Sequence, residues 1–279
     1  MLAAVGSYLQ TRSQGGRWLL RIEDVDTTRS RPQAELQILR TLEAFGFEWD
    51  GPVWRQSTRS DAYAAALATL QSSGQLFRCS CSRRDMQGAN DGLGARCCGH
   101  CEQRQSQIAN TACSWRWRVA AHEALQFNDL WQGMQRADPA ELDDIVLRRR
   151  DGLHAYQLAV VVDDAAQGVT QVVRGADLLA STPYQILLQK SLGLPQPAYG
   201  HLPLLLEPDG SKLAKTRRSA AVEPGAAAEQ LWSTLQRLHQ SPPAELAQAP
   251  LQAIWRWAFA NWQPLRLRGI GRIVLPKAG

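Results

Sequence analysis

The sequence predicts an α/β protein with a cysteine-rich insertion, and three observations carry that prediction. Apolar residues follow helical spacing over residues 2–10, and Gly15-Gly16 then interrupts the chain. The apolar segment 17–23 comes next and has the length of a buried strand. Residues 79–101 hold five cysteines and hardly any other apolar side chains, so they cannot form a hydrophobic core of their own.

Two helices and a strand are expected after the first strand. Residues 32–45 predict a helix that begins near a proline suited to a first helical turn. The apolar face of this helix contains Leu36, Leu39, Leu42 and Phe45. Residues 60–72 predict a second helix. Apolar and cationic side chains alternate over residues 114–119, which indicates a strand whose arginines face water.

The second half of the chain continues the α/β pattern. Two apolar runs, 145–147 and 156–162, flank Asp151-Gly152, which is typical of a hairpin or another tight turn. Residues 169–174 predict a further strand, and a helix begins at Thr182. Helices are also expected near residues 223–239 and 244–261. Packing, rather than base stacking, is the expected role of four tryptophans there, Trp232, Trp255, Trp257 and Trp262.

Composition and charge limit the classes of protein to which this chain can belong. The 279 residues are 44% hydrophobic and 20% charged, which is ordinary for a globular domain with a sizeable core. No apolar stretch approaches the ~20 residues of a membrane span, and the start has no signal-peptide pattern, so we expect a cytoplasmic protein. The net charge of +5 favours a polyanionic partner only weakly. The clusters at 148–150 and 215–218 suit phosphate contacts, although a solvated basic face explains the first equally well.

The cysteine spacing indicates a metal site. Five of the six cysteines fall within residues 79–101, in the pattern Cys-x-Cys followed by CCGHC. In a reducing compartment such clustering favours a metal over disulfides, and a metal would supply the staple that this segment needs. A bare cluster of reduced cysteines is the alternative. Cys113 lies apart and is expected to be a small buried residue.

Two motifs carry candidate chemistry. In the segment RIEDVDTTRSRP, acidic groups end a predicted strand and precede a helix, a position where ligands collect in open α/β sheets. Glu23 could receive an ammonium there, whereas a loop in which Asp24, Asp26 and Arg29 pair with one another needs no ligand. In DGSKLAKT, Lys212 and Lys215 could follow a phosphate through a reaction, although two lysines at this spacing also occur on solvated surfaces.

Taken together and in this order, these motifs resemble the class I glutamyl- and glutaminyl-tRNA synthetase family. SKLAK stands where that family has its KMSKS-type loop, and DIVLRRRDGLHAYQLAVVVDD and VTQVVRGADLLASTPYQI are similar to its second catalytic half. The resemblance extends over residues 1–216. It is closest to the short branch of the family, the glutamyl-Q tRNA(Asp) synthetases, because the segment after Lys215 is too short for helical anticodon-binding domains.

The resemblance implies a Rossmann-like class I aminoacyl-tRNA synthetase catalytic domain with a zinc-binding insertion and a short α-helical C-terminal segment. Residues 1–75 and 123–200 would form its two halves. Residues 76–122 would form the zinc-binding insertion, and residues 201–279 the KMSKS-type loop and the helical segment. The family carries a HIGH-type signature before the first helix, so we expect that the printed chain starts inside the fold. An upstream in-frame segment should then encode that signature.

The resemblance also implies roles for individual residues. Glu23 would hold the amino group of glutamate, Tyr156 would line the same pocket, and Arg174 would pair with a substrate carboxylate. The alternative roles are a core aromatic residue for Tyr156 and a loop ion pair for Arg174. Lys215, helped by Lys212, would neutralise the phosphates of ATP. The implied zinc ligands are Cys79, Cys81, Cys97 and Cys101, with Cys98 or His100 as alternatives to Cys97.

The implied reaction is the activation of glutamate by ATP with Mg²⁺, followed by transfer to queuosine in the anticodon loop of tRNA(Asp). The implied partners are ATP, L-glutamate and tRNA, and the protein is expected to act as a monomer, away from membranes. Two alternatives stay open. The chain could be a fragment of a glutamyl-tRNA synthetase that charges tRNA(Glu), or a zinc-containing RNA-binding paralogue without catalytic activity.

Overall fold

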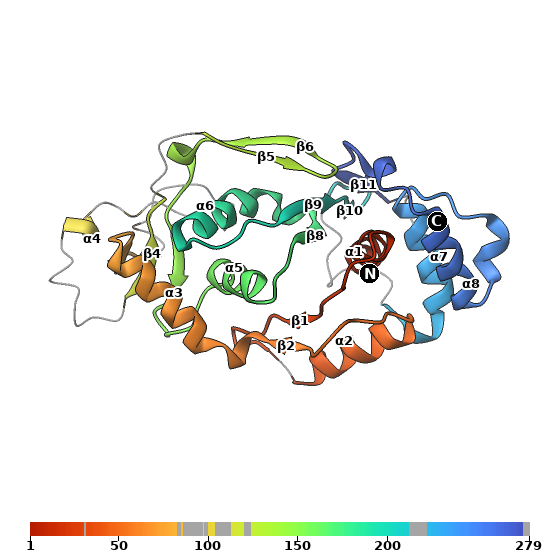
Figure 1. Ribbon diagram of the computed structural model, residues 1–279, viewed down its shortest axis with the longest axis horizontal. Coiled ribbons are helices and arrows are strands. Elements are labelled where there is room, and N and C mark those ends of the chain that lie inside the picture. The colour runs from red at the N-terminus through yellow and green to blue at the C-terminus, as the bar shows by residue number, and fades with distance from the viewer. Residues whose placement is uncertain are drawn as a thin grey trace.

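The computed structural model describes residues 1–30, 32–82, 85, 97, 100–103, 113–119, 124–211 and 222–275. The α-helices in these residues are α1 (Leu2–Ser13), α2 (Pro32–Ala44), α3 (Ser60–Ser72), α4 (His100–Gln103), α5 (Tyr156–Ala166), α6 (Thr182–Leu192), α7 (Ala227–Arg237) and α8 (Leu251–Asn261). The strands are β1 (Arg21–Ile22), β2 (Trp54–Arg55), β3 (Leu76–Cys79), β4 (Ser114–Trp117), β5 (Leu125–Asp129), β6 (Gly133–Ala137), β7 (Ile145–Arg148), β8 (Gln171–Gly175), β9 (Ala198–Leu202), β10 (Leu204–Leu206) and β11 (Arg272–Val274). The molecule is elongated, with α7 and α8 at one end and α4 at the other (Figure 1).

Two hydrophobic cores lie side by side along the molecule. The first core joins α1 to α7, α8 and the C-terminal part of α2. The second core joins α3, α5 and α6 to strands of the two larger sheets. Figure 1 shows the extended segment between α1 and β1, together with β8, running between these two groups of helices. Any ligand bound between the cores would therefore contact both halves of the fold.

The first helix is confirmed, whereas the strand that follows it is shorter than predicted. Helix α1 ends before Gly15, whose φ of 65° lets the chain turn back. Of the segment 17–23, only β1 is a strand, and it pairs in parallel with β2. The amide of Trp54 also donates to Leu20 O at 3.2 Å, on the same edge of the segment. The other side of the segment borders a cleft, so a ladder with two neighbours does not form.

Helix α2 is also confirmed, but its apolar face is only partly covered. Leu42 and Phe45 are buried in the first core, whereas Leu36 is 56% exposed. Only the C-terminal part of the helix reaches that core. The helical spacing of apolar residues therefore predicted the helix correctly, and the exposure of Leu36 contradicts the prediction that this residue faces the core.

Strands β3, β4 and β7 form an antiparallel sheet in which β4 is central. The predicted strand at 114–119 is present, but the prediction that its arginines face water is wrong for Arg116. This side chain is only 4% exposed, and its Nη1 donates to Asp144 O at 2.8 Å. The pairing of β4 with β7 shifts register between Trp115 and Arg116, and such a shift interrupts the alternation of faces on which the prediction depended.

The tight turn at Asp151-Gly152 is confirmed. Gly152 has a φ of 88°, and the amide of Arg149 donates to Leu153 O at 2.8 Å across the turn. The apolar run that follows is not a strand, however, but helix α5. Residues 157–161 of this helix are all buried, because α5 packs between α3 and α6. A helix buried on nearly all sides shows no amphipathic period, so a short apolar run could not distinguish it from a strand.

The largest sheet has the strand order β6-β5-β9-β8. Strands β5 and β6 form an antiparallel hairpin, whereas β9 runs parallel to both of its neighbours. The strand predicted at 169–174 is observed as β8, and the predicted helix α6 follows it. Because β5, β8 and β9 run parallel, their carboxyl ends meet at one edge of the sheet. Side chains near Asp129, Arg174 and His201 therefore come together there.

The C-terminal helices pack on α1 and close the first core. The indole N–H of Trp255 donates to Phe45 O at 2.7 Å, and that of Trp262 donates to Gln10 Oε1 at 3.0 Å. Trp232 donates to Pro243 O at 3.0 Å. These contacts confirm the packing role predicted for the tryptophans of this segment. Among the described residues, no helix has both the length and the apolar character required to cross a membrane.

Candidate active site

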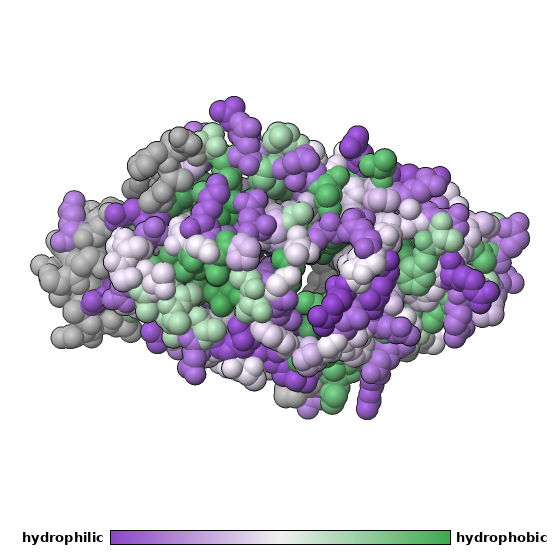
Figure 2. Space-filling model, in the orientation of Figure 1, coloured by the Kyte–Doolittle hydropathy of each residue, from purple (hydrophilic) through white to green (hydrophobic). Residues whose placement is uncertain are grey.

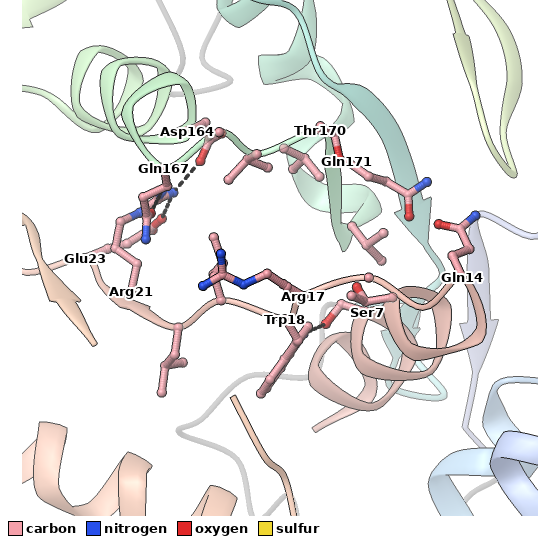
Figure 3. Close-up of a pocket in the computed structure, with 18 residues that line it drawn as sticks. Ser7, Gln14, Arg17, Trp18, Arg21, Glu23, Asp164, Gln167, Thr170 and Gln171 are labelled. Carbon is pink, nitrogen blue, oxygen red and sulfur yellow. Dashed lines mark hydrogen bonds and ion pairs between the residues drawn. The ribbon is translucent and has the colours of Figure 1, made fainter. Parts of the chain in front are cut away.

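A cleft of about 550 Å³ lies between the two cores. One wall is the end of α1 and the extended segment that runs into β1, and the opposite wall is the end of α5 and the start of β8. Figure 2 shows a hollow near the middle of this face of the molecule. In the close-up, Arg17 points into the open space while Ser7 and Gln14 lie at the α1 end and Glu23 and Asp164 at the other (Figure 3).

The far end of the cleft carries a cluster of charged side chains. Arg21 donates to Asp164 Oδ1 at 2.8 Å and to Gln167 Oε1 at 2.8 Å, and its Nη2 lies 3.5 Å from Glu23 Oε1. Glu23 follows β1 directly, which places its carboxylate at the carboxyl end of that strand. Because Asp164 is the closer partner of Arg21, the charge of this guanidinium is largely compensated without Glu23. The Glu23 carboxylate therefore keeps capacity for a cation in the cleft.

Burial and neighbouring charges act in opposite directions on these acids. Burial raises the pKa of Glu23, and the positive charge of Arg21 opposes this effect without cancelling it. Burial likewise raises the pKa of Asp164 against the same guanidinium. The side chain of Glu23 is nevertheless 42% exposed, because it faces the cleft while protein surrounds the cleft itself. A ligand ammonium would replace that solvent and favour the ionised form.

The neighbouring residue on α5 has a structural role instead. Asp163 is fully buried and accepts hydrogen bonds from Gln56 Nε2 at 3.1 Å and Tyr63 Oη at 2.6 Å, in addition to an ion pair with Arg59. These bonds tie α5 to α3 and to the chain before it. Successive residues on a helix point about 100° apart, so this buried anchor fixes the direction in which Asp164 faces the cleft.

Tyr156, the predicted pocket residue, belongs to α5, the helix whose other end borders the cleft. It is the first residue of α5 and is partly buried. Burial and the negative charge of Glu23 raise the pKa of Tyr156 to about 12, and the positive charge of Arg174 acts against this rise. The phenol is therefore protonated at neutral pH and can donate a hydrogen bond.

Arg174 stands near the end of β8 and is almost completely buried. Its Nε donates to His201 Nε2 at 3.1 Å and its Nη2 donates to Thr182 Oγ1 at 2.9 Å. The guanidinium also lies over the ring of Tyr199, 5.3 Å from the ring centroid. Its charge lowers the pKa of Glu23, although less than burial raises it. The structure thus brings three predicted site residues, Glu23, Tyr156 and Arg174, into one electrostatic neighbourhood.

Two predicted site residues lie outside the described part of the chain, and three residues that line the cleft were not predicted. Lys212 and Lys215 lie outside the described residues. Arg21, Asp164 and Gln167 were not predicted, although the sequence contains one signal for Arg21 and another for Asp164. Arg21 precedes Glu23 by two positions and so lies on the same side of an extended chain. Asp164 belongs to an acidic pair that ends a strongly apolar run.

The loop after Glu23 and the arginine cluster are held by internal contacts. Asp26 pairs with Arg149 at 2.6 Å and with Arg29 at 3.6 Å, as the salt-bridged reading of the loop predicts. Asp24 does not join them but accepts hydrogen bonds from the amide and hydroxyl of Ser57. In the arginine cluster, Arg150 donates to Cys81 O at 2.6 Å. Arg149 and Arg150 thus bond to other parts of the protein, whereas the two interpretations of this cluster were phosphate contacts and a solvated basic face.

The second candidate site is a cluster of four thiols, which we call the thiol cluster: Cys79, Cys81, Cys97 and Cys101. Their sulfur atoms all lie within 4.8 Å of one another, and neighbouring sulfurs are 3.5–3.8 Å apart. A tetrahedral zinc with bonds of about 2.3 Å requires sulfur-to-sulfur distances of about 3.8 Å. Disulfides would need about 2.05 Å. The four donors therefore fit a closed, tetrahedral four-thiolate metal site.

The thiols differ in acidity. Burial raises the pKa of Cys79 to about 11. For Cys101 burial acts in the same direction, but hydrogen bonds from the amide and hydroxyl of Ser80 and from neighbouring thiols outweigh it and lower the pKa to about 6. Cys101 thus becomes the thiolate that a metal requires more readily than Cys79 does. Cys98 and the side chain of His100, the alternative ligands, lie outside the described residues.

Comparisons with known proteins agree with this geometry. Residues 2–237 match the family described as tRNA synthetases class I (E and Q), catalytic domain. The chain is 48% identical over 268 residues to a glutamyl-Q tRNA(Asp) synthetase of Pseudomonas aeruginosa, a match that covers 96% of this chain and 89% of the relative. It is 49% identical over 268 residues to the protein of the same name from Aromatoleum aromaticum, covering 94% of this chain and 83% of that one.

Among solved structures, the chain resembles a glutamate tRNA ligase from Elizabethkingia meningosepticum that was crystallised in complex with its amino acid. The TM-score is 0.74 at 22% sequence identity, and the match covers 97% of this chain. The chain spans 63% of the length of that ligase. At this level of identity the similarity establishes the fold.

Proposed function

The chain belongs to the class I tRNA synthetase family for glutamate and glutamine, and we propose that it activates glutamate with ATP and transfers it to queuosine in the anticodon loop of tRNA(Asp). The relatives with this name are about 48% identical over nearly the whole chain. ATP, glutamate and tRNA are the proposed partners, and the cytoplasm is the proposed compartment.

The observation that carries the proposal is the Glu23 carboxylate, which lines the cleft beside Arg21 and Asp164 and is 42% exposed there. Glutamate has one ammonium and two carboxylates, so a site for it needs a carboxylate, a guanidinium and neutral hydrogen-bond donors. Glu23 would bind the ammonium, Arg174 would pair with one carboxylate, and the protonated hydroxyl of Tyr156 would donate a hydrogen bond. The electrostatic influence of Arg174 on both other residues supports this assignment.

The chemistry requires no nucleophile from the protein. A carboxylate oxygen of glutamate would attack the α-phosphorus of ATP, the bond to the bridging oxygen would break, and pyrophosphate would leave. The hydroxyl of the tRNA nucleoside would then displace AMP from the acyl carbon. Negative charge grows on the phosphates during the first step, so the proposed roles of Lys215 and Lys212 are to neutralise it, together with the Mg²⁺ that accompanies ATP.

The proposed metal at the thiol cluster is zinc in a structural role. Four thiolates fill the coordination sphere of a tetrahedral zinc and leave no position for substrate. Arg150 supports this part of the chain from outside, because it donates to the carbonyl of Ser80, which lies between Cys79 and Cys81 in the sequence, and to the carbonyl of Cys81. The cleft and the thiol cluster would therefore be separate, the first for reaction and the second for folding.

The test is glutamate-dependent exchange of pyrophosphate into ATP, followed by transfer to purified tRNAs. It should be run on the 279-residue protein and on its Lys215→Ala variant. We expect exchange with glutamate and not with glutamine, and its loss on Lys215→Ala. Transfer should occur to queuosine-containing tRNA(Asp) but not to tRNA(Asp) that lacks queuosine.

Two outcomes would contradict the proposal. Absence of glutamate-dependent exchange would contradict glutamate activation and favour an RNA-binding role. Charging of tRNA(Glu) in place of tRNA(Asp) would keep the activation step and overturn the acceptor.

A further inference from the structure

Asp129, His201 and Arg174 form a buried row across three strands, and we infer that Asp129 and His201 position the Arg174 guanidinium for the substrate carboxylate. The inference rests on the proposed function for the identity of that substrate. The three residues come from β5, β9 and β8, which are neighbours in the largest sheet. Arg174 is paired in register with His201, and Asp129 with Tyr199, two residues before His201. The register thus places the three side chains on one face of the sheet.

Asp129 is the fixed end of the row. It is 1% exposed, and its Oδ1 accepts hydrogen bonds from the amides of Trp131, Gln132 and His201 at 2.9–3.2 Å. Burial raises the pKa of Asp129, but the hydrogen bonds from His201 and from these amides outweigh burial and lower it overall. Asp129 is therefore an ionised acceptor, and its Oδ2 lies 2.6 Å from His201 Nδ1.

The two ends of the row determine the tautomer of His201. An ionised carboxylate can only accept, so His201 Nδ1 must carry a proton and donate it to Asp129. A guanidinium can only donate, so His201 Nε2 must be the unprotonated acceptor of the Arg174 Nε–H bond at 3.1 Å. His201 is thus neutral, with its proton on Nδ1. A second proton on His201 Nε2 would point that N–H group at the Nε–H group of Arg174, and two donors cannot form a hydrogen bond with each other.

This arrangement holds the guanidinium in one orientation. Nε is bound by His201, Nη2 is bound by Thr182 Oγ1 at 2.9 Å and Leu178 O at 3.3 Å, and Tyr199 lies against the plane. Within the described part of the chain, Nη1 of Arg174 has no hydrogen-bond partner. An arginine with one free donor and a fixed plane loses little freedom when it binds a carboxylate. The row would therefore lower the KM for glutamate through Arg174.

A buried polar row could also serve only stability, and matched variants at His201 separate the two roles. His201→Asn keeps a donor toward Asp129 and loses the acceptor for Arg174, whereas His201→Gln can keep that acceptor. Gln189→Leu is the control, because it removes another buried hydrogen bond, from Gln189 Nε2 to Tyr199 Oη at 2.9 Å, and leaves the Tyr199 ring that faces Arg174 unchanged. A role in stability alone predicts similar kinetics for all three folded variants.

The kinetic readout is glutamate-dependent exchange, with melting temperatures measured in parallel. For His201→Asn we expect the KM for glutamate to rise about 10- to 100-fold while the KM for ATP changes less than about twofold. His201→Gln should recover part of the loss, and Gln189→Leu should leave the KM for glutamate unchanged. The positioning role is excluded if His201→Asn and Gln189→Leu have the same KM for glutamate, or if His201→Asn changes the KM for glutamate and the KM for ATP equally.

A second readout needs no activity and no variant. Nitrogen-15 NMR of the unmodified protein should show the His201 proton on Nδ1 at neutral pH and a slowly exchanging Arg174 Nε–H. A proton on Nε2 would overturn the inference even if the enzyme is active. If the protein shows no glutamate-dependent exchange, the proposed function fails, and the NMR result still decides whether the row exists as described.

Discussion

The cleft and the thiol cluster are two polar sites that the same chain builds in different ways. In the cleft, Arg21, Glu23 and Asp164 carry charges of both signs, and Glu23 is left with a distant partner and a surface open to solvent. In the thiol cluster, four sulfur donors lie within 4.8 Å of one another. A closed set of like donors suits an ion that stays bound, whereas an incompletely paired set of charges suits a ligand that comes and goes.

The two sites also depend on the sequence in different ways. The ligands of the thiol cluster come from residues 79–101, so they lie close to one another in the sequence. The charges of the cleft come from β1 and from the end of α5, more than 140 residues apart, as the 146-residue separation of Arg21 and Gln167 shows. Damage to the thiol cluster should therefore affect folding first, and damage to the cleft should affect substrate binding first.

The largest expected effect is that of Cys101→Ser on the thiol cluster. Loss of one of four ligands should reduce bound zinc from about one equivalent to less than half. The free energy of unfolding should fall by more than about 4 kcal/mol, because loss of a structural metal is among the most destabilising changes. Metal analysis and thermal melting measure both. Cys113→Ser, the matched control, should keep the metal. An unsubstituted protein purified with less than half an equivalent of zinc would show that the cluster is not a zinc site.

A smaller effect, confined to the cleft, is expected from Glu23→Gln. The amide keeps the shape of the side chain but loses the charge that would bind the ammonium. Since a hydrogen bond to a charged group contributes about 1.5–3 kcal/mol, the KM for glutamate should rise roughly 10- to 150-fold, with the melting temperature nearly unchanged. Glu43→Gln removes the same charge from an exposed site on α2 and should change neither value. If the two variants behave alike, Glu23 does not bind the substrate.

The smallest expected effect is the pH dependence caused by Glu23, whose protonation should change substrate binding and folding stability in opposite directions. Burial raises the pKa of Glu23, so protonation should begin at higher pH than for an ordinary glutamate, and kcat/KM for glutamate should fall about 10-fold per pH unit below that pKa. Folding has the opposite sign. Because the folded state binds this proton more tightly than the unfolded state, Glu23 contributes stability below the raised pKa and loses that contribution as the pH rises through it.

The pH profile of kcat/KM for the Glu23→Gln variant is the control for this prediction. The acidic limb of kcat/KM that belongs to Glu23 should disappear in the variant, whatever its absolute rate. An acidic limb of the same midpoint and slope in both proteins would assign the titration to another group, such as Asp164, whose pKa is also raised by burial.

Much of the fold could be predicted from local patterns. Helices α1, α3 and α6 follow from apolar spacing and from the proline at the start of α6. The turn at Asp151-Gly152 follows from residues that tolerate it. The prediction of a strand over 156–162 was wrong, because α5 is covered on nearly all sides and its apolar run has no period. The predicted orientation of Arg116 was wrong, because the register shift between β4 and β7 cannot be predicted from the sequence pattern.

For the candidate site, Glu23, Tyr156 and Arg174 were predicted through the family resemblance. In the structure Glu23 lines the cleft, and the charge of Arg174 acts on the pKa of both Glu23 and Tyr156. Their partners were not predicted. Arg21 is bound by an acid on α5, and Arg174 is held by a histidine on β9 whose own partner is an aspartate on β5. Which acid meets which base depends on how the strands are ordered in the sheet, and the spacing along the chain does not contain that order.

The sequence by itself therefore determined the family, the helices with one exposed face, and the cysteines available for a metal, because each of these is encoded by residues close together along the chain. The tertiary structure alone decided that the run at 156–162 is a helix, that Arg116 is buried, and that Asp129 and His201 hold Arg174. Those outcomes depend on contacts between distant segments. Such contacts form only where burial and strand pairing bring side chains within a few ångströms of one another.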